Sequence, residues 1–493
     1  MKTGLKPGRE ELFSRIDEVL DFAIRNIRQI DMGSTFWNEC IGPSLSFADK
    51  VIIETALLVL FAKRVSDKNG YPAEKVIQLG ELLDPLVRGD HNKKLLMRNP
   101  QTAMVFGIGH AALNSIGMED AFSEYLIDRA FQTGEVFNTE RLPYRKMDAI
   151  WLNNLLRPDH VMDFSSTLKE GILNTRAHPL YMNTADVYSL THALMYATDF
   201  GVHPVPAMVD HTYIKAVVDA LTAHHLLSDN LDITGELVMS AVMMAHSGSL
   251  YTRMGWELLT SAWNKFGFLP CPTFEANDYK SLSGAEASSY AFRHLYHTMY
   301  VGGILCCQLL NDVSDLEVKQ TVLPFSVQEL KERISVSVKR VAEFAGVPVS
   351  DLNTEEGEPL AVEDVLQYLT EKITHHFEHK GAPQHLLSVI EQHEEWKGKA
   401  LLNVLIDSML IHAVHEYDLN LLTDLLHLIP AAALPVTLTV ARSAGFLMDQ
   451  QLPGGAIGIW FLEKENLNSE NAKLISEEFA RCLRRLQRYL DEF

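Results

Sequence analysis

Cysteine is scarce in this sequence, and other features that would identify a protein class are absent. Five cysteines occur in 493 residues, an odd number without regular spacing, which excludes a disulfide framework. Glycine (28) and proline (19) are not enriched, which excludes a fibrous or low-complexity chain. The longest apolar stretches, such as 51–62 and 428–440, are too short or too interrupted to span a bilayer. The N-terminal residues lack the apolar segment of a secretory signal peptide.

Basic residues are too few to balance the acidic ones. There are 43 Lys and Arg against 64 Asp and Glu, which gives a net charge of −21. A surface of that charge repels nucleic-acid phosphates and anionic lipids, so we expect neither nucleic acid nor a membrane as a partner. Sparse thiols, with Cys306 and Cys307 adjacent in an apolar run, fit a reducing compartment. We therefore expect a cytoplasmic protein, and its oligomeric state is left open.

Several motifs for cofactors and nucleophiles are missing as well. The sequence has no phosphate-binding Gly-x-x-x-x-Gly-Lys-Ser/Thr and no dinucleotide-binding Gly-x-Gly-x-x-Gly after a strand. It also lacks the Gly-x-Ser-x-Gly turn that carries a serine nucleophile, and the His-Glu-x-x-His zinc motif. We therefore expect a small-molecule reaction without ATP, NAD or another cofactor.

The pattern that is present is helical. Roughly eighteen segments, including 185–199, 234–248 and 286–311, repeat apolar residues three and four positions apart. Strand-type alternation is almost absent. The sequence therefore predicts an all-α fold, and short connections favour antiparallel neighbouring helices. Two architectures fit this pattern, a closed α/α toroid of two concentric helical rings and an open α-solenoid.

Several helical segments are apolar nearly all round, which favours the toroid because such helices are buried on all sides. A histidine lies in or beside five of these segments: His110, His192, His246, His297 and His412. No linker divides the chain, so we predict one domain over 1–493. It would comprise an N-terminal helix and connection (1–45), the helical toroid (46–461) and a C-terminal helix (462–493).

One predicted helix carries an unusual polar face. Tyr188, His192, Tyr196 and Asp199 follow one another at spacings that place them on one side of a helix. We predict that His192 is a catalytic acid or base, that Asp199 is an orienting carboxylate and that the two tyrosines bind substrate. The alternative is a core histidine with an aspartate that caps the helix end.

A second predicted helix has a similar face, formed by Arg293, His297 and Tyr300. If His297 faces His192, the two helices form one site, with His297 catalytic and with Arg293 and Tyr300 binding substrate. The alternative is a solvated arginine and a histidine that satisfies a backbone carbonyl. Arg141, in the charged stretch 131–145, is a further candidate for binding an anionic substrate group, although a solvated loop with local ion pairs also explains it.

A histidine-rich stretch leaves a metal site open as an alternative. His375 and His379 are four residues apart, and His385 follows. Two such histidines and a carboxylate could bind zinc. The stretch is polar and near a helix end, however, where histidines are common because they interact favourably with the helix dipole.

Two resemblances to known families bear on fold and function. Thr191, His192, Tyr196 and the run 198–201 (Thr-Asp-Phe-Gly), with the later Tyr-His-Thr at 296–298, resemble the motifs of a little-characterised bacterial family associated with natural-product pathways. The run from Gln451 through Gly455 to Trp460 resembles the Gln-Gly-Trp turn of terpenoid cyclases, which implies their α/α toroid fold. The acidic motifs of terpene cyclisation are missing, so the resemblance supports the fold and not that chemistry.

Three functions remain open on the sequence alone. The first is a biosynthetic enzyme of specialised metabolism that acts by acid–base chemistry on a small apolar or peptide-like metabolite in a central cavity. The second is a non-catalytic helical scaffold that binds a partner protein through its acidic surface. The third is a metal-dependent hydrolase or lyase that uses the histidines of 375–385.

Overall fold

The computed structural model describes residues 7–30, 37–42, 45–311, 323–353, 358–377, 382–457 and 470–492, and helices dominate in them. The predicted all-α class is confirmed. The two strands assigned in these residues, β1 (Cys40–Gly42) and β2 (Leu45–Ser46), form one short antiparallel ribbon. Among the same residues, no helix is both long enough and apolar enough to cross a bilayer.

The chain forms two compact units, where the sequence predicts one domain. Unit 1 comprises Met1–Arg176, Thr184–Asp210 and Asn230–Leu316, and unit 2 comprises Ala177–Asn183, His211–Asp229 and Glu317–Phe493. The chain thus enters unit 2 three times and returns to unit 1 after each of the first two segments. The first two segments of unit 2, a short one and a helical one, are inserted within the sequence of unit 1. No change of composition marks these boundaries in the sequence.

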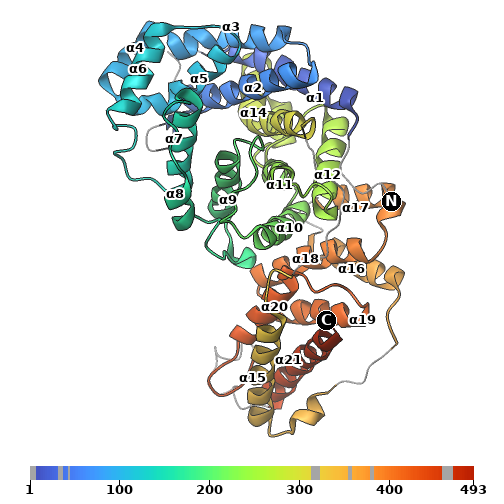
Figure 1. Ribbon diagram of the computed structural model, residues 1–493. Helices are drawn as coiled ribbons and strands as arrows, with labels where there is room; N and C mark the ends of the chain where they lie inside the picture. Colours follow the sequence, from blue (N-terminus) through green and yellow to red (C-terminus); the bar gives the residue numbers. More distant parts are fainter. Residues whose placement is uncertain are drawn as a thin grey trace. The chain divides into compact units, whose positions relative to one another are not determined.

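Unit 1 contains most of the helices (Figure 1). They are α1 (Arg9–Ile27), α2 (Phe47–Asn69), α3 (Glu74–Arg88), α4 (Asp90–Arg98), α5 (Ala103–Ser115), α6 (Ala121–Gln132), α7 (Pro143–Leu156), α8 (Ser165–Glu170), α9 (Thr184–Ala197), α11 (Leu231–Met243), α12 (Leu250–Phe266), α13 (Ala276–Ser281) and α14 (Gly284–Leu309), with a 3₁₀ turn, η1 (Pro100–Thr102).

Six helices of unit 1 contact one another in succession. Helix α2 packs against α5, α5 against α7, α7 against α9, α9 against α11 and α11 against α14, and α14 packs in turn against α2. We call these six the ring helices; α7, α9, α11 and α14 can be followed in this order in Figure 1. Helices α3, α6, α8 and α12 each pack against the ring helix that precedes them, and α1 packs against α14.

Local sequence explains where the ring helices begin and end. Ser46 and Asp49 form a capping box at the start of α2, and Asn230 accepts a hydrogen bond from the Ile233 amide at the start of α11. Helix α9 ends at Ala197, earlier than the 185–199 pattern predicts, because Asp199 and the next two residues have φ of 47°, 55° and 90°. Left-handed residues cannot continue a right-handed helix.

Unit 2 is built around α18. Its helices are α10 (His211–Ser228), α15 (Val327–Ala345), α16 (Val362–Phe377), α17 (Ala382–Gln392), α18 (Lys399–His415), α19 (Leu419–Ala431), α20 (Leu438–Asp449) and α21 (Glu470–Tyr489), with the 3₁₀ turns η2 (Pro179–Tyr181), η3 (Val349–Leu352), η4 (Glu394–Trp396) and η7 (Leu490–Glu492). Helix α18 packs against α10, α16, α19 and α20, and almost all of its side chains are buried.

The turn that resembles the Gln-Gly-Trp motif lies in unit 2. The Gln451 side-chain amide donates hydrogen bonds to the carbonyls of Ser337, on α15, and of Gly455, each at 3.0 Å. Trp460 lies outside the described residues. Gln451 therefore closes the turn after α20 and ties that turn to α15.

Candidate functional site

Helix α11 provides two acidic side chains in an otherwise apolar setting. All thirteen of its residues are buried, and they include Asp232 and Glu236, one helical turn apart. Residues four positions apart lie on the same face of a helix, so both carboxylates project to the same side. A buried carboxylate is costly unless neighbouring groups compensate its charge, and the neighbours of these two are therefore informative.

Asp232 is fully engaged by residues of α9 and α14. Its carboxylate lies 2.6 Å from Nδ1 of His297 and accepts hydrogen bonds from the Tyr188 hydroxyl at 2.8 Å and the Thr298 hydroxyl at 3.2 Å. Burial would raise the pKa of Asp232, but the positive charge of His297 lowers it to about 2. Burial would likewise lower the pKa of His297, but Asp232 and Glu54 raise it to about 9. The two side chains form a buried ion pair.

Glu236 lies against His192 of α9. Its Oε2 accepts a hydrogen bond from the Thr191 hydroxyl at 2.5 Å and lies 3.7 Å from Nδ1 of His192. Burial and the nearby charge of Asp232 raise the pKa of Glu236 to about 7. Burial, with the positive charges of Arg145 and His297, lowers the pKa of His192 to about 3, so this imidazole is neutral at pH 7.

Helix α2 adds a third carboxylate. Oε1 of Glu54 lies 3.5 Å from Nε2 of His297 and 3.6 Å from the Lys50 ammonium group. Its other oxygen, Oε2, is buried and makes no hydrogen bond of ordinary geometry. Five residues from four ring helices thus meet, and we call Glu54, His192, Asp232, Glu236 and His297 the carboxylate–histidine cluster.

The members of the cluster differ in exposure. Asp232 and Glu236 have side chains that are only 7% and 3% exposed, whereas those of His192 and His297 are 23% and 21% exposed. The side chain of Glu54 is 17% exposed. Asp232 and Glu236 are therefore the most buried members of the cluster, and both imidazoles keep some contact with solvent.

Helix α7 places a second polar group beside His192. The rings of Tyr144 and His192 are 5.8 Å apart, and Arg145 lies 3.7 Å from Asp148 on the same helix. Burial raises the pKa of Asp148 to about 6, against the lowering effect of Arg145. Arg145 belongs to the charged stretch 131–145, for which the sequence predicts either binding of an anionic group or local ion pairs, and its contact with Asp148 is such a local pair.

The structure brings together only part of the predicted site. Tyr188, His192 and His297 meet around α11, and the ring of Tyr196 lies 6.1 Å from that of His192. For these four residues, the helix faces predicted from the sequence agree with the positions of the side chains in the structure.

Asp199 lies elsewhere, beyond the C-terminal end of α9. Nη2 of Arg64 donates to both of its carboxylate oxygens, at 3.1 and 3.0 Å, and the Trp151 indole donates to Oδ1 at 2.8 Å. The carboxylate next to His192 is Glu236, not Asp199. The Thr-Asp-Phe-Gly part of the motif therefore ends α9 and holds it to α2 and α7.

The remaining predicted binding residues are also engaged outside the cluster. Arg293 pairs with Glu39 at 2.7 Å, and Tyr300 is fully buried, with its hydroxyl 3.2 Å from that of Thr55. Arg141 donates to a carbonyl of its own loop. The alternative interpretation of Arg141 as part of a locally paired loop fits this contact.

The histidine-rich stretch of unit 2 does not gather metal-type ligands in the described residues. His385 lies 3.6 Å from Asp229, and His375 lies beside His376, while His379 is outside the described residues. Within the part of the chain that the structure describes, the side chains whose ligand atoms converge are those of Asp232, Glu236 and His297 in unit 1. Among the residues that the structure describes, these three are suited to bind a metal ion.

His110, on ring helix α5, is buried away from the cluster. Its Nδ1 lies 2.9 Å from Nη2 of Arg88. Burial and the charge of Arg88 lower the pKa of His110 to about 4. The recurring helix-plus-histidine pattern therefore marks different environments, and only His192 and His297 of the five histidines belong to the cluster.

The low pKa of His110 predicts a stability change with pH. Between its unfolded pKa of ~6.5 and its folded value of about 4, the unfolded state binds more protons, so stability falls as the pH is lowered through this window. Wild type should lose about 2 kcal/mol more than His110→Gln between pH 7 and pH 5. Urea unfolding at the two pH values measures this, and equal losses in both proteins would refute it.

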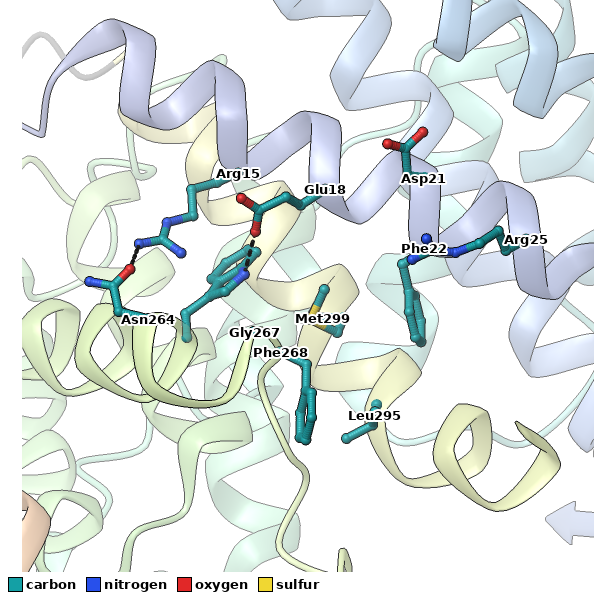
Figure 2. A pocket seen from close by; sticks show the side chains of 11 residues that line it. Arg15, Glu18, Asp21, Phe22, Arg25, Asn264, Gly267, Phe268, Leu295 and Met299 are labelled. Atoms are coloured by element: carbon teal, nitrogen blue, oxygen red, sulfur yellow. Dashed lines mark hydrogen bonds between the residues drawn. The ribbon is translucent and has the colours of Figure 1, made fainter. Parts of the chain in front are cut away.

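A separate pocket of about 530 Å³ opens between α1, α12 and α14 (Figure 2). Its polar groups bond to one another: Arg15 donates to the Asn264 side chain at 2.5 Å, and the Trp263 indole donates to Glu18 at 2.8 Å. These four side chains therefore satisfy one another, and Asp21 and Arg25 are further charged residues of the lining.

The predicted site does not include Asp232 and Glu236, and the sequence pattern shows why. The expected helix at 234–248 begins after Asp232, so the pair Asp232 and Glu236 is split. The available signal was two acidic residues four apart in a segment of otherwise apolar or small residues. Glu54 had a similar signal, because it interrupts the apolar run 51–62.

Comparison with known proteins places this region in a family. The family model described as "Domain of unknown function (DUF6895)" matches residues 16–307, which include all five cluster residues. Neither a curated protein nor a solved structure matches the chain. Because the family match covers more than half of the 493 residues, the chain belongs to the DUF6895 family.

Proposed function

We propose that unit 1 is an enzyme that acts on a small molecule by acid–base chemistry at the carboxylate–histidine cluster. One observation carries the proposal: two imidazoles and three carboxylates from α2, α9, α11 and α14 meet in an apolar interior, and the imidazoles stay accessible to water. Burying this many ionisable groups is costly for folding. Such arrangements are concentrated at functional sites.

We also propose the α/α toroid architecture for unit 1. The closed succession of contacts from α2 round to α14 and back supports it, because an open solenoid has no contact between its first and last helices. The proposed toroid is confined to unit 1 and therefore ends well before residue 461. Active sites of helical assemblies are commonly built from side chains on facing helices, as the cluster is.

The surroundings of His192 favour a small apolar or peptide-like substrate. Tyr144, Tyr188 and Tyr196 place aromatic rings within about 6 Å of the imidazole. Aromatic rings with polar tips bind apolar groups while still offering hydrogen bonds. The motif resemblance to a family of natural-product pathways suggests a metabolite of specialised metabolism as the substrate.

Within this proposal, His192 is the group that transfers a proton to or from the substrate. It is an imidazole, the side chain most often used for such transfers, and it is partly exposed, whereas His297 is held in the ion pair with Asp232. Asp232 fixes the orientation of His297 through the 2.6 Å contact. Asp199, assigned the orienting role from the sequence, has no part in this mechanism.

The proposal is tested in the host that encodes the protein. A deletion strain complemented with His192→Ala should form ~1% or less of the dependent product, since acid–base groups typically contribute 10²–10⁴-fold in rate. His203→Ala, an exposed histidine beyond the end of α9, is the matched control and should restore the product. Untargeted metabolite profiling with immunoblots for equal protein levels provides the measurement.

The outcomes also separate the enzyme from a scaffold. Normal product formation by His192→Ala at the wild-type protein level would overturn the catalytic assignment. A deletion strain whose metabolites are unchanged, together with one partner protein recovered at a one-to-one ratio, would favour the scaffold function instead.

A further inference from the structure

Three cluster side chains have the chemistry and spacing of a metal site. Asp232, Glu236 and His297 each offer one ligand atom, and these atoms all lie within 4.8 Å of one another. Oxygen and imidazole ligands bind a divalent ion at ~2.0–2.2 Å, which places neighbouring ligand atoms about 3–3.5 Å apart. Small side-chain rotations would therefore bring all three onto one ion without moving α11 or α14.

Hydrogen bonds from neighbouring hydroxyl groups hold the carboxylates of Asp232 and Glu236 in place. Asp232 accepts from Tyr188 and Thr298, and Glu236 accepts from Thr191. Outer partners of this kind orient metal-binding carboxylates in known sites, and they are typically hydroxyl, amide or imidazole groups. None of these three hydroxyl donors carries a charge, so within this group only His297 offsets the negative charge of the two carboxylates.

Glu54 adds a carboxylate whose two oxygens have different surroundings. Oε2 of Glu54 is buried without a hydrogen bond of ordinary geometry, although Oε1 of the same side chain lies 3.5 Å from His297. Buried acceptors without a donor are rare in proteins, and such an oxygen is available to a bound water or ion.

We propose that Asp232, Glu236 and Nδ1 of His297 bind one divalent transition-metal ion, with Glu54 against the other ring nitrogen of His297 and with His192 beside Glu236. The inference rests on the proposed function only in using the same site. It changes what that site holds: the metal would take the place of the proton that His297 shares with Asp232. Positions left open towards the exposed imidazole would be available to water or substrate.

The ligand types indicate which ions fit. A set of two carboxylates and one imidazole suits ions from Mn²⁺ to Zn²⁺, whereas Ca²⁺ and Mg²⁺ prefer oxygen ligands alone. No cysteine belongs to the convergent group in the described residues, so the site has no thiolate preference. Zn²⁺ and Mn²⁺ are therefore the appropriate probes.

The test uses the purified full chain after removal of metal with a chelator. Isothermal titration with Zn²⁺ and with Mn²⁺, followed by elemental analysis after desalting, should give one tightly bound ion per chain for at least one of them. Glu236→Gln and Asp232→Asn should each weaken binding at least tenfold. Asp148→Asn, a half-buried carboxylate on α7 outside the convergent group, is the matched control and should bind as wild type does.

Each outcome decides the proposal. Equal binding by wild type and Glu236→Gln would mean that surface histidines hold the ion adventitiously, and absence of tight binding by wild type would overturn the site outright. If Asp232→Asn fails to fold, the isosteric Glu236→Gln and the wild-type stoichiometry decide. Tight metal binding by wild type together with normal product formation by His192→Ala would support the metal site and refute the proton-transfer role of His192. Absence of tight metal binding together with loss of product in His192→Ala would refute only the metal site.

Discussion

Asp199→Ala is expected to destabilise unit 1 by about 3 kcal/mol and to leave the carboxylate–histidine cluster functional. The substitution removes the bidentate contact with Arg64 and the hydrogen bond from Trp151. It also places alanine at a φ of 47°, which aspartate and asparagine tolerate better. Both charged side chains keep some exposure (22% and 19%), so the loss should fall at the lower end of that for a broken buried pair.

Two measurements distinguish this structural role from a catalytic one. Urea unfolding gives the free energy, and metal titration or product formation in the host reports on the cluster. Asp199→Asn, which keeps the shape and the tolerance of positive φ, should lose about half as much stability as Asp199→Ala. Unchanged stability with abolished product would contradict this account and restore Asp199 as a catalytic residue.

Gly455→Ala is expected to destabilise unit 2 by about 3 kcal/mol, since it combines backbone strain with a steric clash. Gly455 has a φ of 100°, which side-chain-bearing residues rarely adopt. An added Cβ would lie 2.4 Å from the Arg340 carbonyl oxygen and 2.9 Å from Cβ of Phe344, both on α15. Neither neighbour is the flexible end of a side chain, so the turn after α20 would have to move away from α15.

The neighbouring glycine provides the control. An added Cβ at Gly454 meets no atom within 4 Å, so Gly454→Ala should change the free energy of unfolding by less than ~0.5 kcal/mol. Urea unfolding of wild type, Gly455→Ala and Gly454→Ala measures both effects. Equal stability of Gly455→Ala and wild type would show that this turn does not pack against α15 as described, and would remove the structural role of the hydrogen bonds of Gln451.

The sequence predicts the helical class well because helical periodicity is a local property. Every ring helix corresponds to a segment with apolar residues three and four positions apart. The division into two units is not local. Helix α10 belongs to unit 2 although the chain before and after it belongs to unit 1. No periodicity or composition in 211–229 distinguishes it from its neighbours.

The candidate site could be predicted from the sequence only where helical spacing decides it. Tyr188 and His192 lie on one face of α9 because they are four residues apart, and the structure brings that face to His297. The same spacing argument is wrong for Asp199, because α9 ends at Ala197 and Asp199 itself has a positive φ. Whether a histidine contacts a carboxylate from another helix depends on tertiary packing. The contact between His192 and Glu236 could therefore not be predicted from helical spacing.

Unpaired acidic residues in apolar segments are the sequence signal that would have improved the prediction. Glu54 and Glu236 each lie in a run of apolar or small residues, where a charge is costly unless the fold supplies a partner. In this chain both of these glutamates belong to the cluster, whereas only two of the five histidines noted in the helical segments do. His110 illustrates the difference, because a neutral histidine is accommodated in the core by contacts with Arg88 and Asn114.

The central claim is that the cluster on α2, α9, α11 and α14 faces a space that a ligand can enter. A crystal structure of the full chain, grown with Zn²⁺ or Mn²⁺ and recorded at the absorption edge of the metal, tests this most directly. We predict an anomalous peak within about 2.0–2.2 Å of Asp232, Glu236 and His297, with ordered water towards His192. His192 and His297 on separate faces of unit 1, or apolar side chains filling the space between them, would contradict the account.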